Sequence, residues 1–106
     1  MKKVLKIEVE SFALLVKQLK RVINDADIFE INLDAMRVKG DLAVIYKYFK
    51  KPLIARATNL DLLRSAAKAG WPYILMPKGM ETDLEFTTLV KNKGCTLISS
   101  VDEINL

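Results

Sequence analysis

The chain has 106 residues, of which 51% are hydrophobic and 28% are charged. That length suits one domain, which we expect to span residues 1–106, and the composition excludes a disordered chain because enough apolar side chains are present to form a core. The 17 lysines and arginines outnumber the 13 aspartates and glutamates, and the net charge of +4 permits an anionic ligand without specifying one.

Several residue types are missing or scarce, and this narrows the chemistry. The sequence has no histidine, which excludes a Ser-His-Asp triad and a histidine-ligated metal. Its single cysteine, Cys95, excludes an internal disulfide and fits a buried thiol in a reducing compartment. No glycine-rich phosphate-binding fingerprint is present. We therefore predict no metal and no cofactor, and assign no catalytic residue.

Location and macromolecular partners are constrained in the same way. No apolar run is long enough to span a bilayer, and no secretory pattern opens the chain, so we expect a cytoplasmic protein without a membrane partner. The aromatic residues are not interleaved with the basic ones, which argues against nucleic acid as a partner.

In chain order, five short apolar segments alternate with four helical patterns. We expect strands at residues 3–8, 27–34, 52–57, 73–76 and 95–99. Helices are expected at about residues 11–24, 41–51, 59–70 and 82–94. Ser11, Asp41 and Asn59 stand where N-caps are expected, and Gly70 and Gly94 stand at helix ends. Strands that alternate with helices indicate parallel pairing with right-handed crossovers, and hence an α/β fold.

The second predicted strand has one polar face. Glu30, Asn32 and Asp34 alternate with apolar neighbours, although helices normally cover both faces of a strand in a parallel sheet. Either these side chains line a pocket, or the strand lies at an edge of the sheet with one face in water. The sequence leaves both interpretations open.

Arg56 is the charged residue of the third predicted strand. A buried guanidinium is costly unless it is paired, and Glu30 or Asp34 on the neighbouring strand could pair with it. Arg56 would then either donate to a small anionic or polyhydroxy ligand or form a structural ion pair. Ligand sites of parallel α/β proteins lie at the carboxyl ends of strands, so we predict a substrate-binding site formed by Glu30, Asn32, Asp34 and Arg56.

Several segments resemble a known family. Residues 26–34 resemble the Ala-Asp-x-x-Glu-x-Arg-x-Asp signature on the second strand of type I 3-dehydroquinate dehydratase, a (β/α)8 barrel of the shikimate pathway. Residues 51–56, 69–74 and 93–102 are similar to that family's third, fourth and fifth strand regions. The resemblance implies that Glu30, Asp34 and Arg56 hold a substrate.

The chain also departs from that family. Asn32 replaces its strand arginine, Val101 falls at its catalytic histidine, and its Schiff-base lysine lies on a sixth strand that is missing here. We therefore expect a non-catalytic or incomplete relative of the dehydratase that binds a small polyhydroxy acid. One alternative is a subunit or fragment that needs a complementing chain and would then act as a carbon–oxygen lyase. Another is a structural or interaction module without a small-molecule site.

The resemblance also favours one arrangement of the sheet. We predict a five-stranded parallel sheet of βα repeats in the order 1-2-3-4-5, a partial (β/α) barrel. The alternative is a flavodoxin-like open sheet in the order 2-1-3-4-5. A partial barrel leaves its first and fifth strands unpaired on one side, and few charges protect them. On this ground we expect a homodimer.

Overall fold

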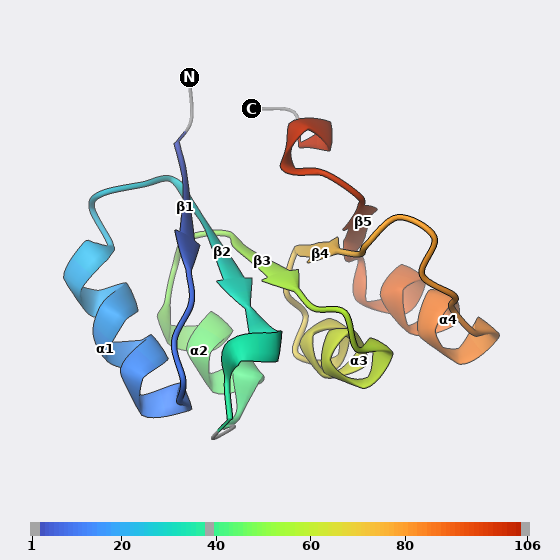
Figure 1. The fold of residues 1–106 in the computed structure, drawn as a ribbon, viewed down its shortest axis with the longest axis horizontal. Coiled ribbons are helices and arrows are strands. Elements are labelled where there is room, and N and C mark those ends of the chain that lie inside the picture. Colours follow the sequence, from blue (N-terminus) through green and yellow to red (C-terminus); the bar gives the residue numbers. More distant parts are fainter. Residues whose placement is uncertain (1–2, 38–39, 105–106) are drawn as a thin grey trace.

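The computed structural model describes residues 3–37 and 40–104. Its strands are β1 (Val4–Ile7), β2 (Ile28–Asn32), β3 (Leu53–Arg56), β4 (Tyr73–Leu75) and β5 (Thr96–Ile98). Its α-helices are α1 (Phe12–Val22), α2 (Leu42–Tyr48), α3 (Leu60–Lys68) and α4 (Leu84–Lys93). Two 3-10 turns complete the fold, η1 (Leu33–Ala35) and η2 (Val101–Glu103) (Figure 1). No helix in this described part is long and apolar enough to cross a membrane.

All five strands form one parallel sheet in the order β1-β2-β3-β4-β5. This confirms the partial-barrel arrangement, and the flavodoxin-like order is wrong. Because β2 pairs with β1 on one side and with β3 on the other, the interpretation of β2 as an edge strand is also wrong. The polar side chains of β2 therefore need an explanation other than a position at the edge.

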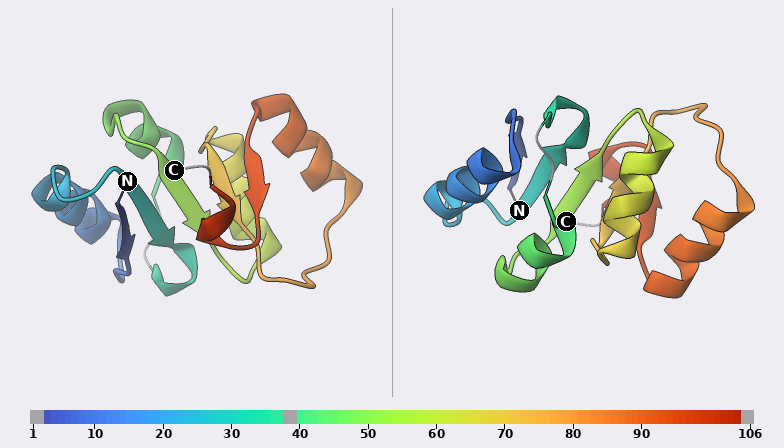
Figure 2. Two further views of the ribbon diagram at one scale, coloured as in Figure 1. Left: turned by 90° about the horizontal axis from the view of Figure 1, so that it is seen from above. Right: turned by 90° about the horizontal axis from the view of Figure 1, so that it is seen from below.

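The sheet has two faces of different character. The four α-helices pack on one face, where the main apolar core includes Phe29, Ile31, Leu53 and Ala55 (Figure 2). We call the opposite face, on which none of the α-helices of the described residues packs, the inner face. In register across the strands it presents Val4, Lys6, Ile28, Glu30, Asn32, Ile54, Arg56, Tyr73, Leu75, Thr96 and Ile98.

The segment after β5 folds back over the inner face. Figure 2 shows η2 lying across the sheet on this face. Ile104, just after η2, is buried and packs with Ile28, Ile54 and Ile98 in a second, smaller core. Ser100 and Glu103 form a capping box that shapes η2. In a closed barrel, side chains of further strands fill the interior. Here the returning segment covers part of that apolar surface and buries Ile28, Ile54 and Ile98.

Local signals account for the helix starts. The side chains of Ser11, Asp41 and Asn59 accept hydrogen bonds from backbone amides of the first turns, which confirms these caps. The fourth helix begins slightly later than expected, because Asp83 caps it. Gly94 ends it with a φ of 71°, a conformation that glycine adopts without strain.

Strand β2 ends earlier than the sequence pattern predicts. It stops at Asn32, whose side chain accepts a hydrogen bond from the amide of Asp34 and caps η1. Asp34 therefore belongs to a 3-10 turn and not to the strand. This local hydrogen bond competes with continuation of the β ladder. As a result, the side chain of Asp34 does not point the same way as that of Glu30 on the strand.

Candidate functional site

A cleft of about 600 Å³ opens on the inner face at the carboxyl ends of the strands. The walls come from β1 to β4, from the loops after β3 and β4, and from the segment that follows β5. The lining residues are Val4, Lys6, Glu30, Arg56, Ala57, Thr58, Leu75, Met76, Pro77, Ser99, Ser100, Val101 and Asp102. The structure thus brings Glu30 and Arg56 of the predicted site together in one cleft, while Asn32 and Asp34 do not line it.

Glu30 and Arg56 form the charged centre of the cleft. Arg56 Nη1 lies 3.6 Å from Glu30 Oε2, which is an ion pair longer than an ordinary hydrogen bond. The Glu30 side chain is only 3% exposed, whereas that of Arg56 is 52% exposed. The expectation of a buried guanidinium was therefore wrong: the carboxylate is the buried partner, because Arg56 is the last residue of β3 and its long side chain reaches solvent.

Asn32 is held by groups outside the cleft. Its Nδ2 donates to Glu8 Oε1 at 2.6 Å, and its Oδ1 accepts from the amide of Asp34 at 3.1 Å. These two bonds tie the end of β2 to the segment after β1. Both ends of the amide are occupied, so Asn32 positions the backbone at this edge of the site.

Asp34 joins two neighbouring loops. Its Oδ2 accepts from the backbone amide of Thr58 at 2.8 Å and from the Thr58 hydroxyl at 2.9 Å. Thr58 in turn lines the cleft beside Arg56. Asp34 therefore supports the wall of the cleft from behind, and its contact with the site passes through Thr58.

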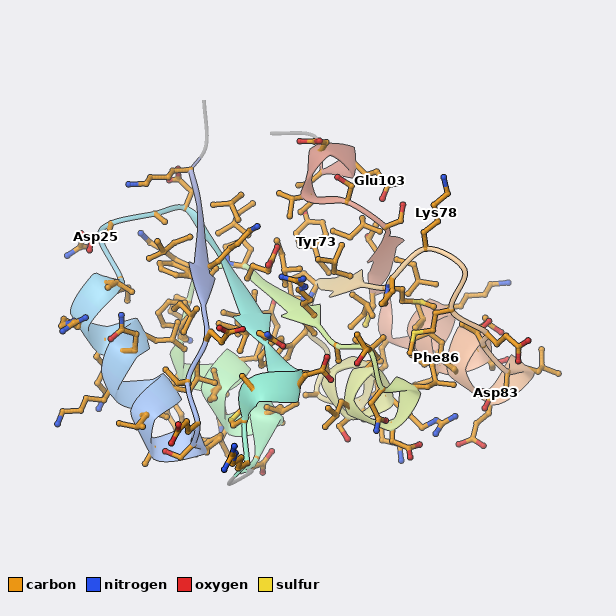
Figure 3. The ribbon with its side chains drawn as sticks, in the orientation of Figure 1. Asp25, Tyr73, Lys78, Asp83, Phe86 and Glu103 are labelled. Carbon is orange, nitrogen blue, oxygen red and sulfur yellow. The ribbon has the colours of Figure 1, made fainter. Side chains whose placement is uncertain are left out.

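The segment after β5 forms the opposite wall. The Glu103 carboxylate accepts from the backbone amides of Ser99 and Ser100 and from the Ser99 hydroxyl. These hydrogen bonds favour the ionised form and lower the pKa of Glu103. Figure 3 shows Glu103 in η2, on the same side of the molecule as Tyr73 of the inner face. The hydroxyls of Ser99 and Ser100 are consequently held at the rim.

Lys6 is a cleft residue that the sequence prediction missed. It stands opposite Glu30 in the β1–β2 register and is exposed at the cleft. The available signal was its position between Leu5 and Ile7, which places a charge on the face of β1 opposite the helices. Lys6 and Arg56 give the cleft two cations around the buried carboxylate.

Cys95 and Lys78 do not line the cleft. Cys95 precedes β5 and is partly buried, with its Sγ 3.8 Å from the Ala67 carbonyl oxygen. Burial raises the pKa of this thiol, which disfavours the reactive thiolate. Lys78 extends into solvent from the loop after β4 (Figure 3). Within residues 3–37 and 40–104, no three aspartate, glutamate or cysteine side chains gather as a metal site.

Comparisons with known proteins identify the fold but no family. No family model matches the chain, and no curated protein matches its sequence. Among solved structures, the fold is similar to that of 7,8-dihydropteroate synthase from Vibrio fischeri ES114, with a TM-score of 0.62 and 13% sequence identity. The similarity covers 90% of this chain and 41% of that one, so the chain spans about two fifths of the length of this structural relative.

These comparisons overturn the resemblance to type I 3-dehydroquinate dehydratase. No family model matches, and the solved structure that does match is a different barrel protein. The dehydratase relative, its shikimate-pathway role and its lyase chemistry are therefore wrong as assignments. The motifs behind the resemblance are short strand endings and Ala-Gly turns, which recur because βα units share the same local requirements. What the structural relative supports is a partial (β/α) barrel.

Proposed function

We propose that the chain binds a small anionic molecule in the inner-face cleft. The observation that supports this most directly is the exposure of Arg56 above the buried Glu30. A guanidinium has five N–H donors, and one long ion pair leaves most of them facing the cleft. The planar fork of an arginine fits the two oxygens of a carboxylate or phosphate.

The surroundings of Arg56 favour the same ligand class. Lys6 adds a second cation, and the hydroxyl of Ser100, which accepts from the Asp102 amide, keeps its own proton to donate at the rim. Leu75, Met76 and Pro77 supply an apolar wall that would exclude water from a bound molecule. The cleft lies at the carboxyl ends of parallel strands, where α/β proteins place their ligands.

Glu30 has a distinct role in this proposal. The buried carboxylate holds the guanidinium over the cleft and limits its rotamers, so that less conformational entropy is lost when a ligand binds. Because the ion pair is longer than a hydrogen bond, the carboxylate also keeps acceptor capacity for a hydroxyl of the ligand. An anion that carries a hydroxyl would use both groups.

The test is a titration of isotope-labelled protein followed by NMR. Inorganic phosphate and citrate serve as anionic probes, and spermidine serves as a cationic probe. We expect the anions to shift the Arg56 Nε–H signal and the amide signals of Ser99 and Ser100. Arg56→Met should abolish these shifts, whereas Arg21→Met, which removes an exposed cation from α1, should leave them unchanged.

Two results would contradict the proposal. Equal shifts in the wild type and in Arg56→Met would show that the anions bind elsewhere. A response to spermidine alone would show that the carboxylates of Glu30 and Asp102, and not the cations, define the ligand.

A further inference from the structure

We propose that the helix side of the protein binds an acidic amphipathic helix of a partner protein. The surface in question is a groove of about 270 Å³ between α1 and α2, which we call the α1–α2 groove. Helices α1 and α2 lie on the side of the sheet opposite to the inner face (Figure 1), so the groove is separate from the inner-face cleft and independent of the function proposed above.

The floor and sides of the groove are apolar. Leu19, Ile45 and Phe49 are buried at its base. Phe12 and Val16 of α1 form one side, and Tyr48 of α2, 72% exposed, stands on the other. A large aromatic residue exposed beside an apolar hollow is typical of a protein-binding surface.

The charges carried by the two helices that form the groove have one sign. Helix α1 carries Lys17, Lys20 and Arg21, helix α2 carries Lys47, and neither helix contains an acidic residue. Lys20 lines the groove, and Lys47 Nζ lies 5.7 Å from the centre of the Tyr48 ring at its lip. Asp25, in the turn after α1, points outward (Figure 3). The groove is therefore an apolar slot with basic edges.

The apolar floor and basic edges of the α1–α2 groove favour one kind of binding partner. A second copy of the chain would bring its own lysines against these, and like charges across an interface are unfavourable. An amphipathic helix that inserts apolar side chains at positions i, i+3 or i+4, and i+7 fits a hydrophobic groove. Acidic residues flanking those anchors would meet Lys20 and Lys47. A concave slot also suits a helix ridge better than the flat surface of a membrane.

The experiment uses a pair of synthetic helical peptides with identical leucine anchors. One peptide carries glutamate at every flanking position, and the matched peptide carries lysine. Fluorescence anisotropy with the full chain should give a dissociation constant at least about tenfold lower for the glutamate peptide, because its charges complement the groove. Raising the salt concentration should weaken that preference.

Matched variants locate the binding. The double change Lys20→Glu and Lys47→Glu should reverse the preference between the two peptides. The control double change Lys68→Glu and Lys91→Glu alters the net charge equally on α3 and α4 and should leave it intact. Circular dichroism confirms that both variants fold.

The other outcomes overturn the proposal. Equal binding of the two peptides, or no binding of the glutamate peptide, would remove the acidic helix as the occupant. Binding to phosphatidylserine vesicles without binding of the glutamate peptide would assign the surface to an anionic membrane instead. Peptide binding that survives the groove variant but not the control would place the site on α3 and α4.

Discussion

Arg56 Nη1 lies 3.6 Å from Glu30 Oε2, and this pair joins a half-exposed cation to an almost fully buried anion. The asymmetry matters for stability as well as for ligand binding. Solvent weakens the attraction at the arginine end, while the buried carboxylate has already lost its water. Removing one partner should therefore have a different effect from removing both.

A double-mutant cycle measures this coupling. We expect Arg56→Met to lower the free energy of unfolding by about 1–2 kcal/mol, since it leaves the Glu30 carboxylate without its ion pair. This is less than the loss of about 3–5 kcal/mol for a fully buried pair broken on one side, because Arg56 is half exposed. Adding Glu30→Gln should recover part of the loss in urea denaturation. Simple additivity of the two changes would mean that the groups do not interact.

Asp34 should contribute to stability through Thr58. Asp34→Ala removes the oxygen that accepts both hydrogen bonds and leaves the Thr58 amide without its partner, so we expect a loss of about 1–3 kcal/mol. Thr58→Val removes only the hydroxyl bond and should cost less, about 0.5–1.5 kcal/mol. Urea denaturation of both variants checks the order. An equal loss in the two would show that the amide bond contributes nothing.

Glu103 should make the segment after β5 sensitive to acid. Its pKa is lowered in the folded chain by the amides of Ser99 and Ser100, so its contribution to stability is present above the ordinary glutamate pKa of about 4.3. That contribution is lost as the pH falls through the lowered folded-state pKa. In urea denaturation, the difference in unfolding free energy between the wild type and Glu103→Gln should therefore shrink as the pH falls through the folded-state pKa of Glu103.

A control separates this effect from general acid denaturation. Asp83 also has a lowered pKa, mainly because it accepts from the Phe86 amide, so the wild type should lose stability in acid for a second reason. The control variant is Glu81→Gln, which makes the same substitution at a glutamate outside η2, in the exposed loop before α4. If the difference in unfolding free energy between Glu103→Gln and the wild type did not change with pH, the role of the capping box would be contradicted.

The edge of the sheet at β5 supports a proposal of homodimerisation. Leu97 is 40% exposed on the helix side of β5, where it stands in register with the buried Ile74. We expect sedimentation at micromolar concentration to give about twice the 12.0 kDa chain mass, because a two-fold contact would cover this apolar edge. Leu97→Glu should shift the protein toward the monomer.

A second exposed leucine serves as the comparison. Leu84, at the start of α4, is 81% exposed and lies away from the edge strand, so Leu84→Glu should leave the dimer intact. A strictly monomeric wild type would refute the dimer. Dissociation by Leu84→Glu but not by Leu97→Glu would place the contact at α4 and not at β5.

Much of the fold follows from the sequence because its signals are local. Apolar periodicity and capping side chains such as Ser11 and Asn59 depend on neighbours within a few residues, and they set the type and order of the five strands and four α-helices. The alternation along β2 likewise places Glu30 on the face opposite Phe29. The sequence thus predicted the parallel α/β class, and it named Glu30 as one of two candidate partners of Arg56.

Only the tertiary structure decided the relations that depend on distant segments. The orders 1-2-3-4-5 and 2-1-3-4-5 contain the same βα units, and the packing of whole strands distinguishes them. The exposure of Arg56 depends on how far its neighbours cover it, and Asp34 turns to Thr58 because η1 redirects it. The burial of Ile104 against Ile28 and Ile54 comes from a chain reversal after β5, since hydrophobic burial rewards contact without specifying which distant segment supplies it.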